Sequence, residues 1–222
     1  MSIKVLARNT LIGFVILAIV YYVCYNWIDI PLMYFVYTGA MGSMWVPISE
    51  MLTLIFSPES WTFFAAVCLV LAFVLMQRGH IKSKHFETLM RFGLTVVTTA
   101  VVVTILKITF GRYRPDMLLT QDLYGFNFFA FGNNNHSTPS GHATLGFCAL
   151  LFIARHFNKT WLSFLLMLLA VAICIAKMIL AEHYLSDLIF GGYLGVIMTL
   201  WMEVILSALK TKYFSAHASH LL

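Results

Sequence analysis

Two histidines and one aspartate in the C-terminal half of the chain carry side chains suited to group transfer. His183 and Asp187 are four residues apart, so on one helix they would share a face. A carboxylate that bonds one imidazole nitrogen fixes the tautomer and leaves the other nitrogen free as a nucleophile. His142 stands apart from this pair, directly after Ser140 and Gly141. The pattern predicts a nucleophilic His183 oriented by Asp187, with His142 as a second catalytic histidine.

Basic residues precede these histidines at spacings that suit the binding of an anion. Lys107 and Arg114 are seven residues apart, nearly two helical turns, so both are predicted to point the same way. Pro115 disfavours helical backbone at Arg114, and the helix is predicted to end there. Arg112 would lie roughly 140° around the helix from Lys107. We interpret Arg112 as an interfacial anchor or as a group behind the ligands, and not as a ligand.

A third cation, Lys177, lies six residues before His183. On a straight helix the two side chains would point about 120° apart. We therefore expect a turn between them, around Ala181 and Glu182, that brings the ammonium group toward the imidazole.

The segment Ser137–His142 has the composition of a helix start. Serine or threonine before proline is typical of the first turn, and Gly141 allows close approach of the backbone to a ligand. Free N–H groups at a helix N-terminus bind anions. His142 would lie in the first turn and face that anion.

Together these groups suit phosphoryl transfer. Cations and helix N–H groups would hold the phosphate oxygens and stabilise the charge of the transition state. His183 would attack phosphorus, and His142 would protonate the leaving oxygen and then activate water. We expect no metal and no cofactor, because Asp116 and Asp122 are too few and too loosely spaced for a metal pair.

Composition restricts the class of protein that holds these residues. The chain has 222 residues, of which 61% are hydrophobic and 10% are charged, against roughly 25% charged in soluble domains. So few charges cannot cover a soluble protein, which excludes soluble globular, disordered and nucleic-acid-binding proteins despite the net charge of +5. A polytopic membrane protein remains.

Charged residues divide the chain into apolar blocks, which we interpret as six membrane-spanning helices of a single all-α domain, residues 1–222. The first block follows Lys4 and Arg8 but is too long for a signal peptide and is predicted to stay uncleaved. The sixth is interrupted by Glu203, which we place at the inner interface. The blocks are 9–28, 60–77, 92–106, 143–154 (span-length if the helix starts at Pro139), 160–176 and 188–209.

Charge also predicts the orientation. The uncharged segment 30–49 holds helix breakers and is predicted to lie along the outer interface rather than to form a seventh span. Six spans with both termini in the cytoplasm then put ten of the fourteen basic residues inside. The four that remain outside lie at helix ends beside the two histidines: Lys107, Arg112, Arg114 and Lys177. The active site is therefore predicted at the outer face of the membrane, which in a bacterium is the periplasmic face of the inner membrane.

Three motifs in this order resemble the type 2 phosphatidate phosphatase superfamily, which includes bacterial lipid phosphatases and shares its core with vanadium haloperoxidases. They are Lys107–Pro115 (Lys, six residues, Arg-Pro), Pro139–His142 (Pro-Ser-Gly-His) and Lys177–Asp187 (a basic residue, five residues, His, three residues, Asp). The resemblance implies a six-helix lipid phosphate phosphatase.

The resemblance also implies a role for each site residue. Lys107, Arg114 and Lys177 would bind phosphate, and Ser140 and Gly141 would donate hydrogen bonds to it. His142 would be the acid, His183 the nucleophile and Asp187 its orienting partner. This chain has Lys177 where the family usually has arginine, which keeps the charge but loses the bidentate fork.

Substrate and rival functions stay open at this point. The expected partner is a phosphorylated membrane lipid: undecaprenyl diphosphate, phosphatidylglycerol phosphate, phosphatidate or a lipid A phosphate, the last favoured by the short chain. The alternatives are a lipid phosphotransferase that uses the same site and a non-enzymatic anion or lipid transporter. The loop 116–138 is rich in aromatic residues, so it would either admit a lipid or pack against helix ends. The sequence does not indicate an oligomeric state.

Overall fold

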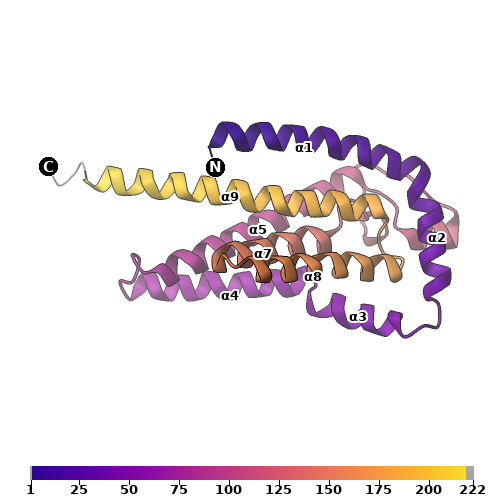
Figure 1. Ribbon diagram of the computed structural model, residues 1–222, viewed down its shortest axis with the longest axis horizontal. Helices are drawn as coiled ribbons and strands as arrows, with labels where there is room; N and C mark the ends of the chain where they lie inside the picture. Colours follow the sequence, from indigo (N-terminus) through magenta and orange to yellow (C-terminus); the bar gives the residue numbers. More distant parts are fainter. Residues whose placement is uncertain (1, 219–222) are drawn as a thin grey trace.

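The computed structural model describes residues 2–218, without the side chains of Asn133 and of residues from 212 onward. Within this range the regular structure is helical (Figure 1). The elements are α1 (Ile3–Val23), a π-helical turn (Cys24–Ile28), α2 (Asp29–Ala40), α3 (Trp45–Ile55), α4 (Pro58–Gln77), α5 (Lys84–Phe110), α6 (Pro115–Gln121), a 3₁₀ turn (Asn133–Asn135), α7 (Gly141–Phe157), α8 (Thr160–Ile179) and α9 (Leu185–Ala218).

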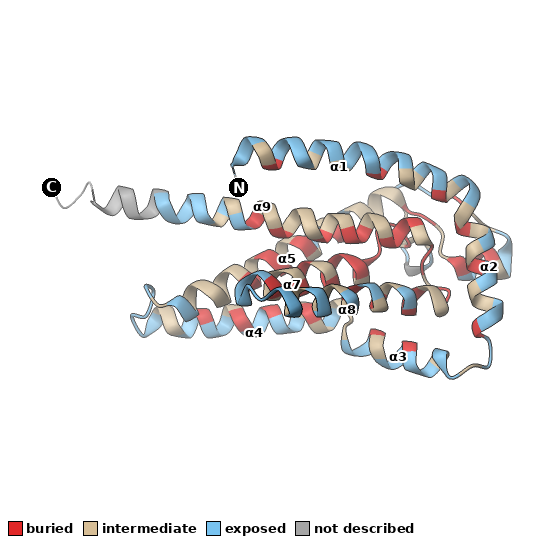
Figure 2. Ribbon diagram, in the orientation of Figure 1, coloured by how far each residue is buried: buried red, intermediate tan, exposed pale blue. Residues whose placement is uncertain are grey.

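Five long helices form a bundle around α7. Helix α7 packs against α5, α8 and α9, α4 packs against α5, and α1 lies along α9 (Figure 1). The core between α4, α5, α7 and α8 contains Trp61, Phe92, Leu145 and Ile173. Figure 2 shows buried residues along the faces that meet inside the bundle, whereas the outward faces of α1 and α4 are exposed. Many exposed side chains there are large and apolar, such as Phe14 and Phe63, as in a protein surrounded by lipid.

The predicted spans correspond to helices, with different ends. Five helical segments are long and apolar enough to cross a membrane: Ile3–Ala40, Trp45–Gln77, Lys84–Phe110, Thr160–Ile179 and Leu185–Thr211. The block 143–154 becomes α7, whose 17 residues extend about 26 Å, slightly less than the hydrocarbon core. Of the six predicted spans, length and hydropathy therefore identify five.

The predicted interfacial segment 30–49 forms α2 and the start of α3, with the break at residues 41–44. Helix α2 crosses one end of the bundle and α3 returns beside α8 (Figure 1). Pro31 and Pro47 lie in the first turns of these helices, where proline is tolerated. Of the predicted breakers, Gly42 lies in the break itself, with φ 72°.

Helix α5 ends at Phe110, and not at Arg114 as predicted. Gly111 caps the helix in the left-handed conformation, with φ 55°. A Cβ atom at this position would overlap the carbonyl oxygen of Asn127. The backbone N–H of Asn127 donates to the Gly111 carbonyl at 2.9 Å, and Tyr113 donates to Gly125 at 3.1 Å. The loop after α6 thus pairs with the residues after α5, and this pairing overrides the helical continuation.

Glycines bring α9 close to the start of α7. A Cβ at Gly191 would lie 2.7 Å from the carbonyl oxygen of Ser140, and one at Gly195 would overlap the carbonyl of Thr144. Small residues allow such close helix contact. The contact places the first turn of α9 beside the segment that precedes α7.

Candidate active site

The structure brings the three motifs together at the end of the bundle that α2 crosses, here called the site end. Lys107 lies in the last turn of α5, and its Nζ is 3.6 Å from the position that a Cβ of Gly141 would take. Gly141 is the first residue of α7. An ammonium group therefore stands beside a helix N-terminus, as the sequence predicts for an anion site.

Arg114 reaches the site from a loop and not from the helix that carries Lys107. It is the N-cap of the short helix α6, and its backbone N–H donates to the Asn134 carbonyl at 3.0 Å. The expectation that both cations project from one helix face is wrong, because α5 has already ended. Even so, the Arg114 guanidinium points into the site, with Nη1 3.7 Å from Oε2 of Glu182.

Ser140 is buried and already engaged within the protein. Its hydroxyl caps α7 by accepting from the backbone N–H of Ala143 at 3.4 Å, and its own N–H donates to the Asp187 carbonyl at 3.1 Å. The backbone donor therefore ties the start of α7 to α9 in this structure. Donation from Ser140 and Gly141 to phosphate stays a prediction.

His142 lies in the first turn of α7, where the sequence places it. One ring nitrogen, Nε2, lies 3.3 Å from the backbone carbonyl oxygen of Thr53 in α3. If that nitrogen carries the proton, the carbonyl accepts a hydrogen bond and leaves Nδ1 as the basic atom. Helix α3, which the motifs do not include, thus holds one catalytic candidate in place.

The turn predicted between Lys177 and His183 is confirmed. Helix α8 ends at Ile179, Ala181 adopts a left-handed conformation with φ 51°, and α9 begins at Leu185. His183 therefore precedes the helix that carries Asp187, and the expectation that both share one helix is wrong. The turn still brings His183 Nδ1 to 3.8 Å from Asp187 Oδ2, too long for a hydrogen bond.

Asp187 is fully buried and accepts hydrogen bonds from several donors. The Ser137 hydroxyl donates to Oδ2 at 2.6 Å, and so does the Tyr184 backbone N–H at 2.9 Å. The Thr138 hydroxyl and Arg112 donate to Oδ1. This carboxylate joins the segment before α7, the loop after α5 and the start of α9.

Arg112 is the centre of this buried network. Its guanidinium is fully buried and pairs with Asp187 at 2.5 Å and with Asp29 at 2.8 Å. The Ser186 hydroxyl donates to Asp29 Oδ2 at 2.5 Å and accepts from Arg112 Nη1 at 2.6 Å. Burial lowers the pKa of Arg112, but Asp187 and Asp29 outweigh that effect and hold the pKa well above its usual range. The interpretation as an interfacial anchor is wrong, because no part of the side chain is exposed. The alternative, a group behind the ligands, agrees with these contacts.

The His183 imidazole is favoured in its neutral form. Burial is the largest cause and lowers the pKa of His183 to about 4. The Asp187 carboxylate opposes this shift, while the positive charges of Lys107 and Arg114 add to it. A neutral imidazole at neutral pH is the form that can act as a nucleophile.

Lys177 is buried at the end of α8, and its Nζ donates to Oε2 of Glu182 at 2.7 Å. The same carboxylate oxygen faces Arg114. The third predicted cation is therefore present at the site, and its partner in this structure is a carboxylate. Among the residues that the structure describes, no cluster of His, Cys, Asp and Glu side chains has an arrangement suited to a metal ion.

Comparison with known proteins agrees with this geometry. Residues 88–210, more than half of the chain, match the PAP2 superfamily, and the protein belongs to this superfamily. The fold is similar to that of a transmembrane PAP2-type phosphatidylglycerolphosphate phosphatase from Bacillus subtilis, with a TM-score of 0.56 and 17% sequence identity. That match covers 88% of this chain and 94% of the other. With its apolar helices, the protein is thus an integral membrane protein with the fold of a lipid phosphatase.

Sequence reasoning missed several residues of the site end. Asp29 has no predicted role in the sequence-based interpretation, and Glu182 is predicted only as part of a turn. The signal for Asp29 was available, because an ionisable side chain next to a membrane span is a functional candidate. The contribution of Thr53 had no signal, since only its backbone carbonyl is used.

Proposed function

We propose that the protein hydrolyses a phosphate monoester or diphosphate of a membrane lipid, without a metal, through a phosphohistidine intermediate. The observation that carries this proposal is the convergence of three cations, from two distant parts of the sequence, on two histidines. The Lys107 ammonium group lies beside the start of α7. Lys177 and Arg114 both face the same carboxylate oxygen, Oε2 of Glu182. The membership in the PAP2 superfamily supports the same reaction class.

In the first step, Nε2 of His183 attacks phosphorus while Nδ1 faces Asp187. The P–N bond forms as the bond to the lipid oxygen breaks, and protonated His142 gives its proton to that oxygen. Lys107, Arg114 and Lys177 stabilise the charge that collects on the equatorial oxygens. These cations take the part that a metal ion plays in other phosphoryl-transfer enzymes.

In the second step, His142 is neutral and accepts a proton from water. The resulting hydroxide attacks phosphorus, the P–N bond breaks, and inorganic phosphate leaves with its electron pair returned to the His183 ring. Each histidine ends the cycle in its starting protonation state. No oxidant, metal or cofactor enters the balance.

A lipid substrate is supported by an apolar groove beside the site. The groove has a volume of about 360 Å³ and lies between α1 and the ends of α5 and α9. Its lining includes Ala18, Phe110 and Phe190, and it reaches Tyr21 and Thr138, which also bond the Arg112 network. A chain that lies in this groove would end next to the charged groups.

The aromatic loop 116–138 contains both packed and exposed rings. Tyr124 and Phe126 pack on Tyr25, whereas Phe128, Phe129 and Phe131 are exposed. Their exposed rings would suit the headgroup region of a bilayer.

The orientation is proposed from the charges. Arg91, Arg155 and Lys210 line pockets at the end away from the site, so the bundle separates most basic residues from the candidate site. We propose that this opposite end and both termini face the cytoplasm, and that the site faces the periplasm of a bacterial inner membrane. A reporter fused at the C-terminus should then be active in the cytoplasm, and one inserted near Asn134 should not.

The test of the function is phosphate release by the purified protein in detergent with excess EDTA. The panel contains phosphatidylglycerol phosphate, the substrate named for the Bacillus neighbour, with phosphatidate, undecaprenyl diphosphate and a lipid A phosphate. We expect chelator-resistant release from at least one of them. Ala18→Trp should raise KM for long-chain substrates but not for a short-chain analogue, while Ala66→Trp on the exposed face of α4 serves as the control. Loss of activity in EDTA, restored by magnesium, would reject the mechanism.

The same assay separates the rival functions. A phosphotransferase would release little inorganic phosphate until a second lipid is supplied as acceptor. A transporter would release none and would move labelled anion or lipid across vesicles instead.

A further inference from the structure

One carboxylate occupies the space between two of the proposed phosphate-binding cations. Oε2 of Glu182 accepts a hydrogen bond from Lys177 Nζ at 2.7 Å and lies 3.7 Å from Nη1 of Arg114. Glu182 is in the turn between α8 and α9, directly before His183, and its N–H donates to the Lys177 carbonyl at 3.1 Å. The motif that ends in His183 and Asp187 does not specify an acidic residue at position 182.

Glu182 stabilises this arrangement when no phosphate is bound. The Lys177 side chain is only 6% exposed, and a buried ammonium without an opposite charge is strongly unfavourable. Arg114 adds a second positive charge close by. The carboxylate therefore offsets part of the positive charge that Lys177 and Arg114 bring to the empty site.

The same position conflicts with a bound substrate. A phosphate oxygen on Lys177 and Arg114 would take the place that Oε2 holds, and two anions would repel each other at that distance. The Glu182 side chain has room to move away, since it is 36% exposed and comes from a turn rather than from a helix. Its rotation toward solvent would free both cations together.

We propose that Glu182 is an exchangeable internal anion, which holds the phosphate position in the empty site and is displaced by the phosphate group of the substrate. The inference rests on the proposed function. It makes Glu182 a positioning residue that keeps Lys177 and Arg114 in place and lowers the affinity for inorganic phosphate. Product release is then assisted by the return of the carboxylate.

The test uses full-length protein in detergent and the variants Glu182→Gln, Glu182→Asp and Glu59→Gln. Glu59 is a matched control, because its charge acts on Lys107 and Lys177 through space while its carboxylate bonds neither of them. Calorimetry gives the dissociation constant of inorganic phosphate, and kinetics give kcat, KM and the product-inhibition constant.

We expect Glu182→Gln to bind phosphate about five- to tenfold more tightly, the scale of one partly exposed charge pair. Its KM and product-inhibition constant should fall together, and Glu59→Gln should change each by less than about twofold. Glu182→Asp, whose shorter side chain keeps the charge but reaches less far, should fall between wild type and Glu182→Gln. This variant also tests the inference if Glu182→Gln is too unstable to purify.

Two results would overturn the inference while the proposed function stands. Wild-type protein that releases lipid phosphate, with an unchanged phosphate affinity in Glu182→Gln, would place the phosphate elsewhere. Weaker binding in that variant would make Glu182 a partner of the bound phosphate instead of its competitor. Wild-type protein that neither binds nor releases phosphate would overturn the proposed function, and this inference with it.

Discussion

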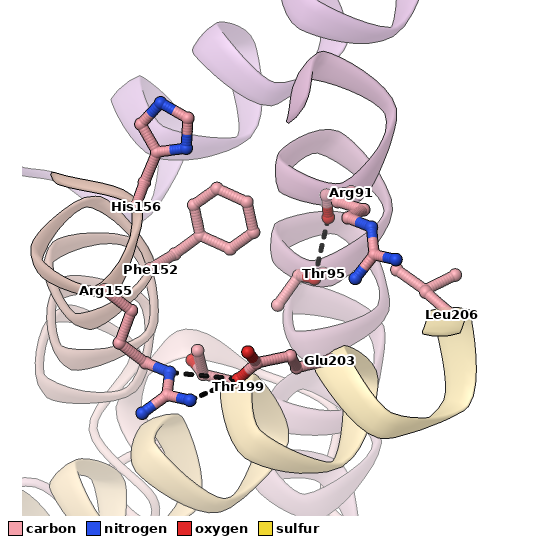
Figure 3. Close-up of a pocket in the computed structure, with 8 residues that line it drawn as sticks. All are labelled: Arg91, Thr95, Phe152, Arg155, His156, Thr199, Glu203 and Leu206. Carbon is pink, nitrogen blue, oxygen red and sulfur yellow. Dashed lines mark hydrogen bonds and ion pairs between the residues drawn. The ribbon is translucent and has the colours of Figure 1, made fainter. Parts of the chain in front are cut away.

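The two ends of the helix bundle both carry ion pairs, and the pairs differ in burial and in number of partners. At the site end, Arg112 and its two carboxylates are fully buried. At the opposite end, Arg155 pairs with Glu203 at 2.7 Å, and both side chains are about half exposed. Figure 3 shows Arg155 and Glu203 meeting at the edge of a pocket of about 150 Å³.

The two sets of charges have different consequences for stability. An exposed pair contributes roughly 0–1 kcal/mol, because water solvates either partner when the other is removed. A buried pair costs desolvation energy to form, but breaking it costs about 3–5 kcal/mol because a lone charge stays behind. The opposite end therefore tolerates change, whereas the site end holds three chain segments in one arrangement through Arg112.

The strongest destabilisation is expected at Arg112. Arg112→Met should lower the free energy of unfolding by about 3–5 kcal/mol, since Asp29 and Asp187 would stay buried without their cation. Arg155→Met at the opposite end is the matched control and should cost less than about 1 kcal/mol. Chemical denaturation in detergent measures both. Equal losses of unfolding free energy in the two variants would show that burial of the ion pair does not determine its contribution to stability.

Lys177 is expected to affect turnover more than stability. Lys177→Ala should lower kcat by about 10²–10³-fold, the usual effect of removing one preorganised donor to a transition state. Lys177→Arg should keep a sizeable fraction, because the cation is retained. Lys159→Ala, an exposed lysine before α8, should stay within about twofold of wild type. Near-normal kcat in Lys177→Gln would mean that Lys107, Arg114 and backbone groups hold phosphate without it.

The smallest expected effect is a shift in pH dependence. Because the nucleophile must be neutral, kcat/KM should fall as the pH drops through the pKa of His183, about 4. A nearby cation lowers that pKa, so Lys107→Gln should raise it and move the acid limb to higher pH. The measurement is the pH profile of kcat/KM from pH 3.5 to 7 for wild type, Lys107→Gln and Lys159→Gln on one substrate. Titration of the substrate affects all three proteins equally, so a difference between them comes from the protein. If the acid limb does not move in Lys107→Gln, the charge of Lys107 does not lower the pKa of His183.

The sequence predicted the helices and the site motifs better than it predicted the connections between them. Apolar blocks locate the helices because burial in lipid depends on composition. The turn at Ala181 was predicted because Lys177 and His183 would point about 120° apart on a straight helix. The end of α5 was misplaced because Pro115 is a local signal, whereas Gly111 ends the helix through pairing with Asn127. The partners of Arg112 could not be predicted from local sequence either, since Asp29 lies 83 residues away in sequence.

Rapid-quench labelling shows whether His183 carries the phosphoryl group during turnover. Purified protein is mixed with a substrate from the panel labelled in its phosphate, quenched in base and mapped by peptide. Wild type should show a transient, acid-labile phosphohistidine at His183, and His183→Ala should show none. His142→Ala should accumulate the label on a substrate with a good leaving group, since water is then not activated. Label on another residue, or full turnover by His183→Ala, would contradict the account.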